Sequence, residues 1–411
     1  MTTTRRLSHR ARWAVPAAAA LVVAGAFAAP ALVANADTDL PELTAEQLVY
    51  HVAAADPAAL SGTVVYTARL GLPEIPLGEV AGADPVNLLG GSSTLRVWTD
   101  GQARSRVALL GATSEYSVVS DGPEAWTYAS DDNEVVHYTV SAADRARLEA
   151  MKAEATTPPR AHGALPTPQE AGREALALAQ RDSTISVEPP TTVAGRDAYR
   201  VVVEPKSDTT LVGRIVVAVD AETWTALRVQ VWSADEPITP ALEVGFTDVD
   251  FAKPSDAVLT FTPPPGAATR DVVVPLPTEQ QLADARADAD AKATAGLPDG
   301  VTVTGTGWDT VVELADVDVD ALISADPQTV AEGYRKTFGS QGAQELYEQW
   351  VPAHGDGMVP DLDSAALYEA LTTPVPQGRV LRSALLSALI TDDGRVLVGA
   401  VPVDTLLALA Q

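Results

Sequence analysis

The spacing of hydrophobic and polar positions changes several times along the chain, and each change marks a predicted element. In residues 44–55 apolar side chains such as Leu48 and Val52 recur at the spacing of one helix face. Thr44 precedes this stretch and Gln47 follows three residues later, which is the pattern of a capping box. The segment is therefore predicted to be an amphipathic helix.

From Ser61 onward apolar positions alternate with polar ones, as they do in a half-buried strand. Asp100-Gly101 is a strong two-residue hairpin signal, and two more turns are predicted at Asp121-Gly122 and Asp131-Asp132. The strands of this first meander are predicted at residues 61–70, 93–99, 103–109, 115–119, 125–128 and 135–140.

Helical composition between residues 142 and 180 interrupts the sheet, and Thr167 is a suitable cap for a helix over 168–180. Strand patterns then resume and form a second, better patterned meander. Its strands are predicted at residues 184–188, 198–204, 213–219, 226–232 and 242–251.

A smaller unit is predicted after the proline-rich stretch 262–266 and an Ala/Asp-rich helical segment at 277–295. Residues 300–411 combine short strand and helix patterns and suggest a small α+β unit. The predicted strands are 310–314, 379–391 and 395–401, and the predicted helices are 327–334 and 364–371.

The amino terminus has the features of an export signal. Arginines precede an apolar stretch at residues 14–33, and Ala34-Asn35-Ala36 supplies the small residues that signal peptidase reads. Residues 1–36 are therefore predicted to be a signal peptide, or an uncleaved anchor at the outer face of the cytoplasmic membrane, because the apolar stretch approaches the length of a bilayer span.

Composition narrows the possible functions. The chain has no cysteine, which excludes disulfides and thiol chemistry, and its formal net charge of -27 disfavours nucleic-acid binding. Its five histidines lack metal-ligand spacing, and residues 316–320 imitate a calcium loop without its central glycine. There is no G-x-S-x-G elbow and no phosphate-binding glycine loop, so we expect no enzyme activity, metal or cofactor.

Three local patterns, in the correct order, resemble the LolA and LolB family of lipoprotein carriers and the related RseB-type sensors. The first is the strand and turn at 116–122 followed by Trp126 and Tyr128. The second is the strand at 199–205 followed by Val219-Asp220 and Thr223, and the third is the proline-rich segment 256–266, which resembles the closing strand of the family.

This resemblance implies an α+β fold: an incomplete, curved antiparallel β-barrel covered by helices, with an apolar cavity for acyl chains. The half-barrel is expected over residues 37–270, followed by a helical acidic linker at 271–299 and the small C-terminal α+β unit at 300–411. The residues expected to line the concave face are Leu48, Val52, Val64, Tyr66, Leu95, Val97, Val107, Leu109, Tyr199, Val201, Val203, Ile215, Val217, Leu227, Val229 and Phe246.

Two functions stay open at this stage. The first is an exported carrier that shields the acyl chains of a lipid or lipoprotein, and the second is an RseB-like sensor that binds a membrane anti-sigma factor. The family's basic residue and proline at the end of the second strand are replaced by Trp98-Thr99-Asp100-Gly101, so its lid latch does not carry over. Apolar residues on one face of a sheet also commonly do no more than pack a core.

Overall fold

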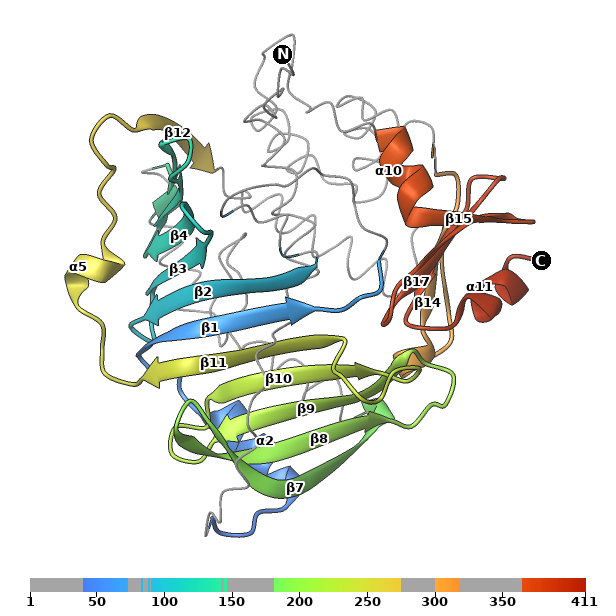
Figure 1. Ribbon diagram of the computed structural model, residues 1–411, viewed down its shortest axis with the longest axis horizontal. Coiled ribbons are helices and arrows are strands. Elements are labelled where there is room, and N and C mark those ends of the chain that lie inside the picture. Colours follow the sequence, from blue (N-terminus) through green and yellow to red (C-terminus); the bar gives the residue numbers. More distant parts are fainter. Residues whose placement is uncertain are drawn as a thin grey trace.

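The computed structural model describes residues 40–72, 83, 88, 90–141, 144–145, 181–274, 300–317, 319 and 364–411. Within them the chain is mostly sheet with few helices. A large twelve-stranded sheet is followed by a separate six-stranded sheet near the carboxyl end (Figure 1).

The large sheet contains both predicted meanders. Its strand order is β12-β6-β5-β4-β3-β2-β1-β11-β10-β9-β8-β7, so β1 and β11 join the two meanders at the centre. The strands are β1 (Leu60–Ala68), β2 (Gly91–Thr99), β3 (Arg104–Leu110), β4 (Glu115–Asp121), β5 (Glu124–Ala129), β6 (Glu134–Val140), β7 (Ser183–Val193), β8 (Arg196–Pro205), β9 (Val212–Asp220), β10 (Ala226–Ser233), β11 (Leu242–Asp250) and β12 (Ala268–Val274).

The large sheet curls but does not close, because its two edge strands, β12 and β7, do not pair with each other. All neighbouring strands run antiparallel except β12, which runs parallel to β6. The predicted incomplete, curved barrel is therefore confirmed.

The helix predicted near the amino terminus is α2 (Ala45–Ala54). Thr44 caps it by accepting the backbone N–H of Gln47 at 3.2 Å, while the Gln47 side chain accepts the backbone N–H of Thr44 at 2.9 Å. This reciprocal capping box confirms the sequence prediction. We call the sheet face on which α2 packs the inner face and the opposite one the outer face.

The segment 256–266, expected to be a strand, is not one, and this prediction was wrong. Residues Asp256–Leu259 form the short helix α5, and three consecutive prolines without N–H donors follow it. Residues 251–267, which we call the outer strap, cross the outer face of β2–β4 and lead into β12 (Figure 1). Strand β12 was not predicted, and its residues 271–274 lie in the segment expected to be a linker.

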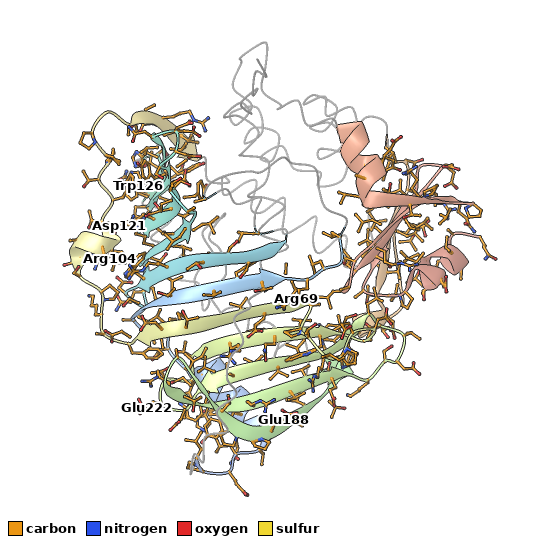
Figure 2. The ribbon with its side chains drawn as sticks, in the orientation of Figure 1. Arg69, Arg104, Asp121, Trp126, Glu188 and Glu222 are labelled. Atoms are coloured by element: carbon orange, nitrogen blue, oxygen red, sulfur yellow. The ribbon has the colours of Figure 1, made fainter. Side chains whose placement is uncertain are left out.

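Buried and aromatic contacts with strands of the first meander hold the outer strap in place, and an exposed ion pair lies at its start. Leu259 is fully buried, and the Phe261 ring lies 6.0 Å from that of Trp126. At the start of the strap Asp256 accepts from Arg104 at 2.7 Å. Figure 2 shows Arg104 and Trp126 on the strands beside the strap.

The second sheet has the order β13-β14-β18-β17-β16-β15 and its own apolar core around Leu389, Leu397 and Leu406. Residues 379–391, predicted as one strand, form two strands that a turn connects. The elements of this unit are β13 (Val301–Thr304), β14 (Val311–Leu314), α10 (Ser364–Leu371), β15 (Thr372–Val375), β16 (Gly378–Arg382), β17 (Ser387–Thr391), β18 (Val396–Gly399) and α11 (Val403–Leu409), with the single-turn helix η3 (Gly307–Asp309) between β13 and β14.

Several predicted segments lie outside the described residues. They are the export signal, the helices between 142 and 180, most of the acidic linker and the helix at 327–334. Among the helices that are described, none combines the length and the apolar character needed to cross a membrane.

Candidate functional site

The inner face of the large sheet is the candidate site, because it gathers all of the residues predicted to line a concave surface. All of them are buried members of one apolar cluster except Val107, which is half-buried and packs against it. The members are Leu48 and Val52 from α2, Val64 and Tyr66 from β1, Leu95 and Val97 from β2, Val107 and Leu109 from β3, Tyr199, Val201 and Val203 from β8, Ile215 and Val217 from β9, Leu227 and Val229 from β10, and Phe246 from β11.

Strand register explains why these residues meet. Val64 in β1 lies opposite Phe246 in β11 on one side and Leu95 in β2 on the other. Leu95 in turn lies opposite Leu109 in β3, so one apolar row crosses several strands on the same face. Gly62 makes room for the Phe246 ring, because a Cβ at that position would lie 2.8 Å from a ring carbon.

Helix α2 covers only part of the inner face. Twelve strands at a spacing of about 4.8 Å span roughly 50 Å, whereas ten helical residues extend about 15 Å. Ala83 and Leu88, from the connection between β1 and β2, also pack into the cluster. The buried apolar cluster of the inner face thus extends well beyond the helix that packs on it.

The lining residues have little ionisable character. Burial raises the pKa of the Tyr66 hydroxyl, so this residue stays neutral at physiological pH. Among the described residues no group of three or more His, Cys, Asp or Glu side chains could hold a metal ion. The chemistry that this face favours is the burial of an apolar partner.

Aromatic rings stack where the β9–β10 turn meets α2. The Trp224 ring stacks on that of His51 in α2 at 4.3 Å and on that of Tyr199 in β8 at 5.9 Å. Tyr199 also donates its hydroxyl to the carbonyl oxygen of Pro41 at 3.2 Å. Sequence reasoning gave neither His51 nor Trp224 a role, because no local pattern indicates that the two residues meet.

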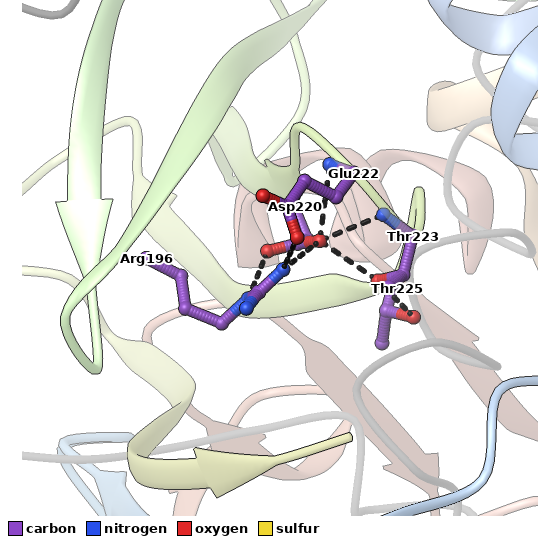
Figure 3. Close-up of polar contacts among 5 residues, drawn as sticks. All are labelled: Arg196, Asp220, Glu222, Thr223 and Thr225. Atoms are coloured by element: carbon purple, nitrogen blue, oxygen red, sulfur yellow. Dashed lines mark hydrogen bonds and ion pairs between the residues drawn. The ribbon is translucent and has the colours of Figure 1, made fainter. Parts of the chain in front are cut away.

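Asp220 holds the turn that carries Trp224 (Figure 3). Its carboxylate accepts from the backbone N–H of Thr223 at 2.7 Å and from Arg196 Nε at 2.5 Å. Arg196 also donates to Glu222 at 2.8 Å, and its guanidinium lies 4.7 Å from the centre of the Phe251 ring. The Asp220 and Thr223 positions of the second sequence motif thus have a structural role at the rim of the inner face.

Burial and hydrogen bonding act in opposite directions on Asp220. Burial acts to raise the pKa of this carboxyl, but the hydrogen bonds from Arg196 and Thr223 outweigh it, so the pKa lies below its usual value. Asp220 is therefore a carboxylate at neutral pH although its side chain is only 1% exposed.

No family model and no curated protein matches the chain. Among solved structures it is similar to the MucA/MucB complex of Pseudomonas aeruginosa, with 18% identity over 89% of this chain and 96% of the other, and a TM-score of 0.38. An uncharacterized conserved protein from Thermus thermophilus matches with 12% identity over 56% of this chain and 99% of the other, at a TM-score of 0.30.

A LolA superfamily protein from Nitrosomonas europaea is also matched, with 10% identity over 54% of this chain and 99% of the other, at a TM-score of 0.20. LolA is the family that the three sequence motifs resemble. Similarity at these levels transfers no function. The chain is similar to LolA-superfamily and MucB structures. What it binds has to be inferred from the residues on its own inner face.

Proposed function

We propose that this chain is an exported protein of the cell envelope that binds the acyl chains of a lipid or lipoprotein on the inner face of its curled sheet. The observation that carries the proposal is the collection of apolar side chains from α2 and seven strands into one cluster on that face. The chain acts as a binding protein and not as an enzyme.

The energetics of an apolar ligand support this proposal. Burying one methylene contributes about 0.8 kcal/mol, so a chain of about fourteen carbons would contribute roughly 10 kcal/mol before the costs of association. Such a ligand needs no catalytic group and no ion pair on the inner face. The open sheet also provides strand ends and rims where a polar head group can stay in water.

A pair of matched substitutions tests the proposal. Val201 in β8 and Val217 in β9 belong to the inner-face cluster, whereas their neighbours Val202 and Val216 are buried on the outer face beside Trp232. We expect Val201→Glu and Val217→Glu to reduce uptake of a fluorescent fatty acid at least tenfold, because a carboxylate there must be desolvated. Val202→Glu and Val216→Glu bury the same charge on the other face and should retain uptake.

Folding is monitored for all four variants by circular dichroism, and Val201→Phe with Val202→Phe provides an uncharged pair that changes only volume. Mass spectrometry of gently purified protein should identify copurified lipid. The proposal is wrong if the purified protein carries no lipid and takes up no acylated probe, or if the inner-face and outer-face variants behave alike.

A second candidate function is that of a sensor for a membrane regulator. One observation favours it: backbone hydrogen bonds join the second sheet to the first, such as that from Leu211 N–H to the carbonyl oxygen of Ala400 at 2.7 Å. The two sheets can therefore present one composite surface to a partner. Capture of a single-pass regulator from solubilised membranes, lost on deletion of residues 296–411, would support this function over a free carrier.

A further inference from the structure

The second sheet meets the first along one edge, which we call the seam. Because neighbouring strands run antiparallel, the end of β1, the start of β7, the end of β8 and the start of β9 all lie at this edge. Figure 1 shows the C-terminal sheet beside these strand ends, opposite the end where β9 turns into β10.

Side-chain hydrogen bonds fix η3 against the first sheet. Trp308 donates its indole N–H to Ser183 Oγ at 2.7 Å. The Asp309 carboxylate accepts from Thr209 Oγ1 at 2.8 Å and also from the hydroxyl of Ser207. Gly307 has a φ of +57°, and a Cβ there would lie 2.5 Å from the Asp182 side chain, so the close approach requires glycine.

Backbone groups complete the seam at two further points. The carbonyl oxygen of Ala400 accepts from Leu211 N–H at 2.7 Å and from Thr210 Oγ1 at 2.8 Å. Ala384 donates its N–H to the carbonyl oxygen of Leu70, just beyond β1, at 2.7 Å. Hydrogen bonds from three separate parts of the second sheet thus hold it in one position relative to the first.

The apolar side chains at the seam connect it to the candidate site. Trp308, Leu385 and Ala400 are half-buried and pack against the inner-face cluster. They come from three different segments of the second unit, and all three contact the same cluster. The second unit therefore packs against the inner-face cluster at this end of the strands.

We infer that the second sheet is an end wall for the bound acyl chain, and that Trp308, Leu385 and Ala400 determine how long a chain the inner face accepts. This inference rests on the proposed function. Each methylene that fits before the wall raises affinity about fourfold, whereas carbons beyond it stay in water and add nothing. Affinity should therefore rise with chain length and then level off.

The test is competition by saturated fatty acids of ten to eighteen carbons against a fluorescent fatty acid, using the full chain. In Trp308→Ala and Leu385→Ala the length at which affinity levels off should increase by about two carbons, with on the order of tenfold tighter binding of the longest acids. Ala400→Leu adds volume to the wall and should shorten the preferred length.

Matched controls separate the wall from the seam. Leu386 follows Leu385 directly but is 42% exposed, so Leu386→Ala should leave the length preference unchanged. Ser183→Ala removes the acceptor for the Trp308 indole without changing the wall volume and should also leave it unchanged. If Trp308→Ala does not fold, Ala400→Leu and Leu385→Val still test whether the wall sets the preferred chain length.

The outcomes distinguish this inference from the function on which it rests. If no fatty acid binds the wild-type chain, the proposed function fails and the end wall fails with it. If the wild-type chain binds but Leu385→Ala, Leu385→Val and Ala400→Leu all level off at the wild-type length, the end wall is excluded while lipid binding stands.

Discussion

Trp224 adopts a backbone conformation that is unusual for its residue type. Its φ is +59°, in the left-handed region, which is disfavoured for a bulky side chain. Hydrogen bonds to Asp220 hold the turn, including the one from Trp224 N–H to the Asp220 carbonyl oxygen at 3.1 Å. The result is an indole ring that stacks between α2 and β8, so one buried carboxylate positions the rim of the inner face.

This arrangement predicts how stability depends on pH. Because the folded pKa of Asp220 lies below its usual value, its stabilising contribution is complete above the ordinary carboxyl pKa of about 3.9 and is lost as pH falls through the folded pKa. We expect Asp220→Asn to lower the free energy of unfolding at pH 7 by roughly 2–3 kcal/mol, since it leaves Arg196 without its buried partner.

Urea unfolding between pH 3 and pH 7 measures this effect, and the difference between wild type and Asp220→Asn should shrink toward the acid end. Glu222 also contacts Arg196, but its side chain is 80% exposed. Glu222→Gln should therefore change stability by less than about 1 kcal/mol. A constant difference across the pH range would contradict our account of Asp220.

The outer strap is the element that links the second meander back to the first. It starts after β11, buries Leu259 against β2, β3 and β4, and ends in β12, which pairs with β6 at the edge of the sheet. His137 of β6 contacts Asp271 of β12 at 2.9 Å and stacks on Trp126 at 5.0 Å. The strap thus secures the strands of the first meander from the outside.

Removing the buried anchor of the strap should loosen it. We expect Leu259→Ala to cost about 2–4 kcal/mol, because the side chain is completely buried and the cavity cannot collapse fully. Amide hydrogen exchange should then accelerate in β12 before it does in β9. Asp256, with its side chain 79% exposed, provides the control, and Asp256→Asn should have little effect. Unchanged exchange in β12 would mean that Leu259 does not anchor the strap.

The two sheets have separate cores, and the seam joins them into one molecule. The inner-face cluster receives side chains from η3 and from connections of the second unit, whereas the core around Leu389 and Leu397 belongs to the second unit alone. Among the described residues, the hydrogen bonds and apolar contacts at the seam therefore couple the unfolding of the two sheets.

Weakening the seam should uncouple the sheets. In Asp309→Ala, Ser207 and Thr209 lose a shared acceptor, and we expect calorimetry to resolve two unfolding transitions where the wild-type chain shows one. The exposed residue Thr302 of β13 serves as the control, since Thr302→Ala leaves the seam intact. A single transition for Asp309→Ala would show that the seam does not depend on this carboxylate.

Much of the fold could be predicted because its signals are local. Alternating apolar positions and Asp-Gly turns predicted β1 to β6, and the Thr44 and Gln47 pair predicted the start of α2. The residues predicted to line the inner face lie in one cluster, because successive side chains of a strand point to opposite faces of the sheet. Strand β12 and the outer strap were missed or wrongly predicted, since a parallel edge strand and a proline-rich crossing depend on distant partners.

By itself the sequence determined where apolar and polar residues alternate and where strands turn, because these patterns depend on residues close together along the chain. Only the tertiary structure decided that Trp224 stacks on His51 and that Asp220 pairs with Arg196. It also decided that the second unit packs against the inner-face cluster at one end of the strands. These contacts join segments far apart in sequence, and curvature and strand register bring them together.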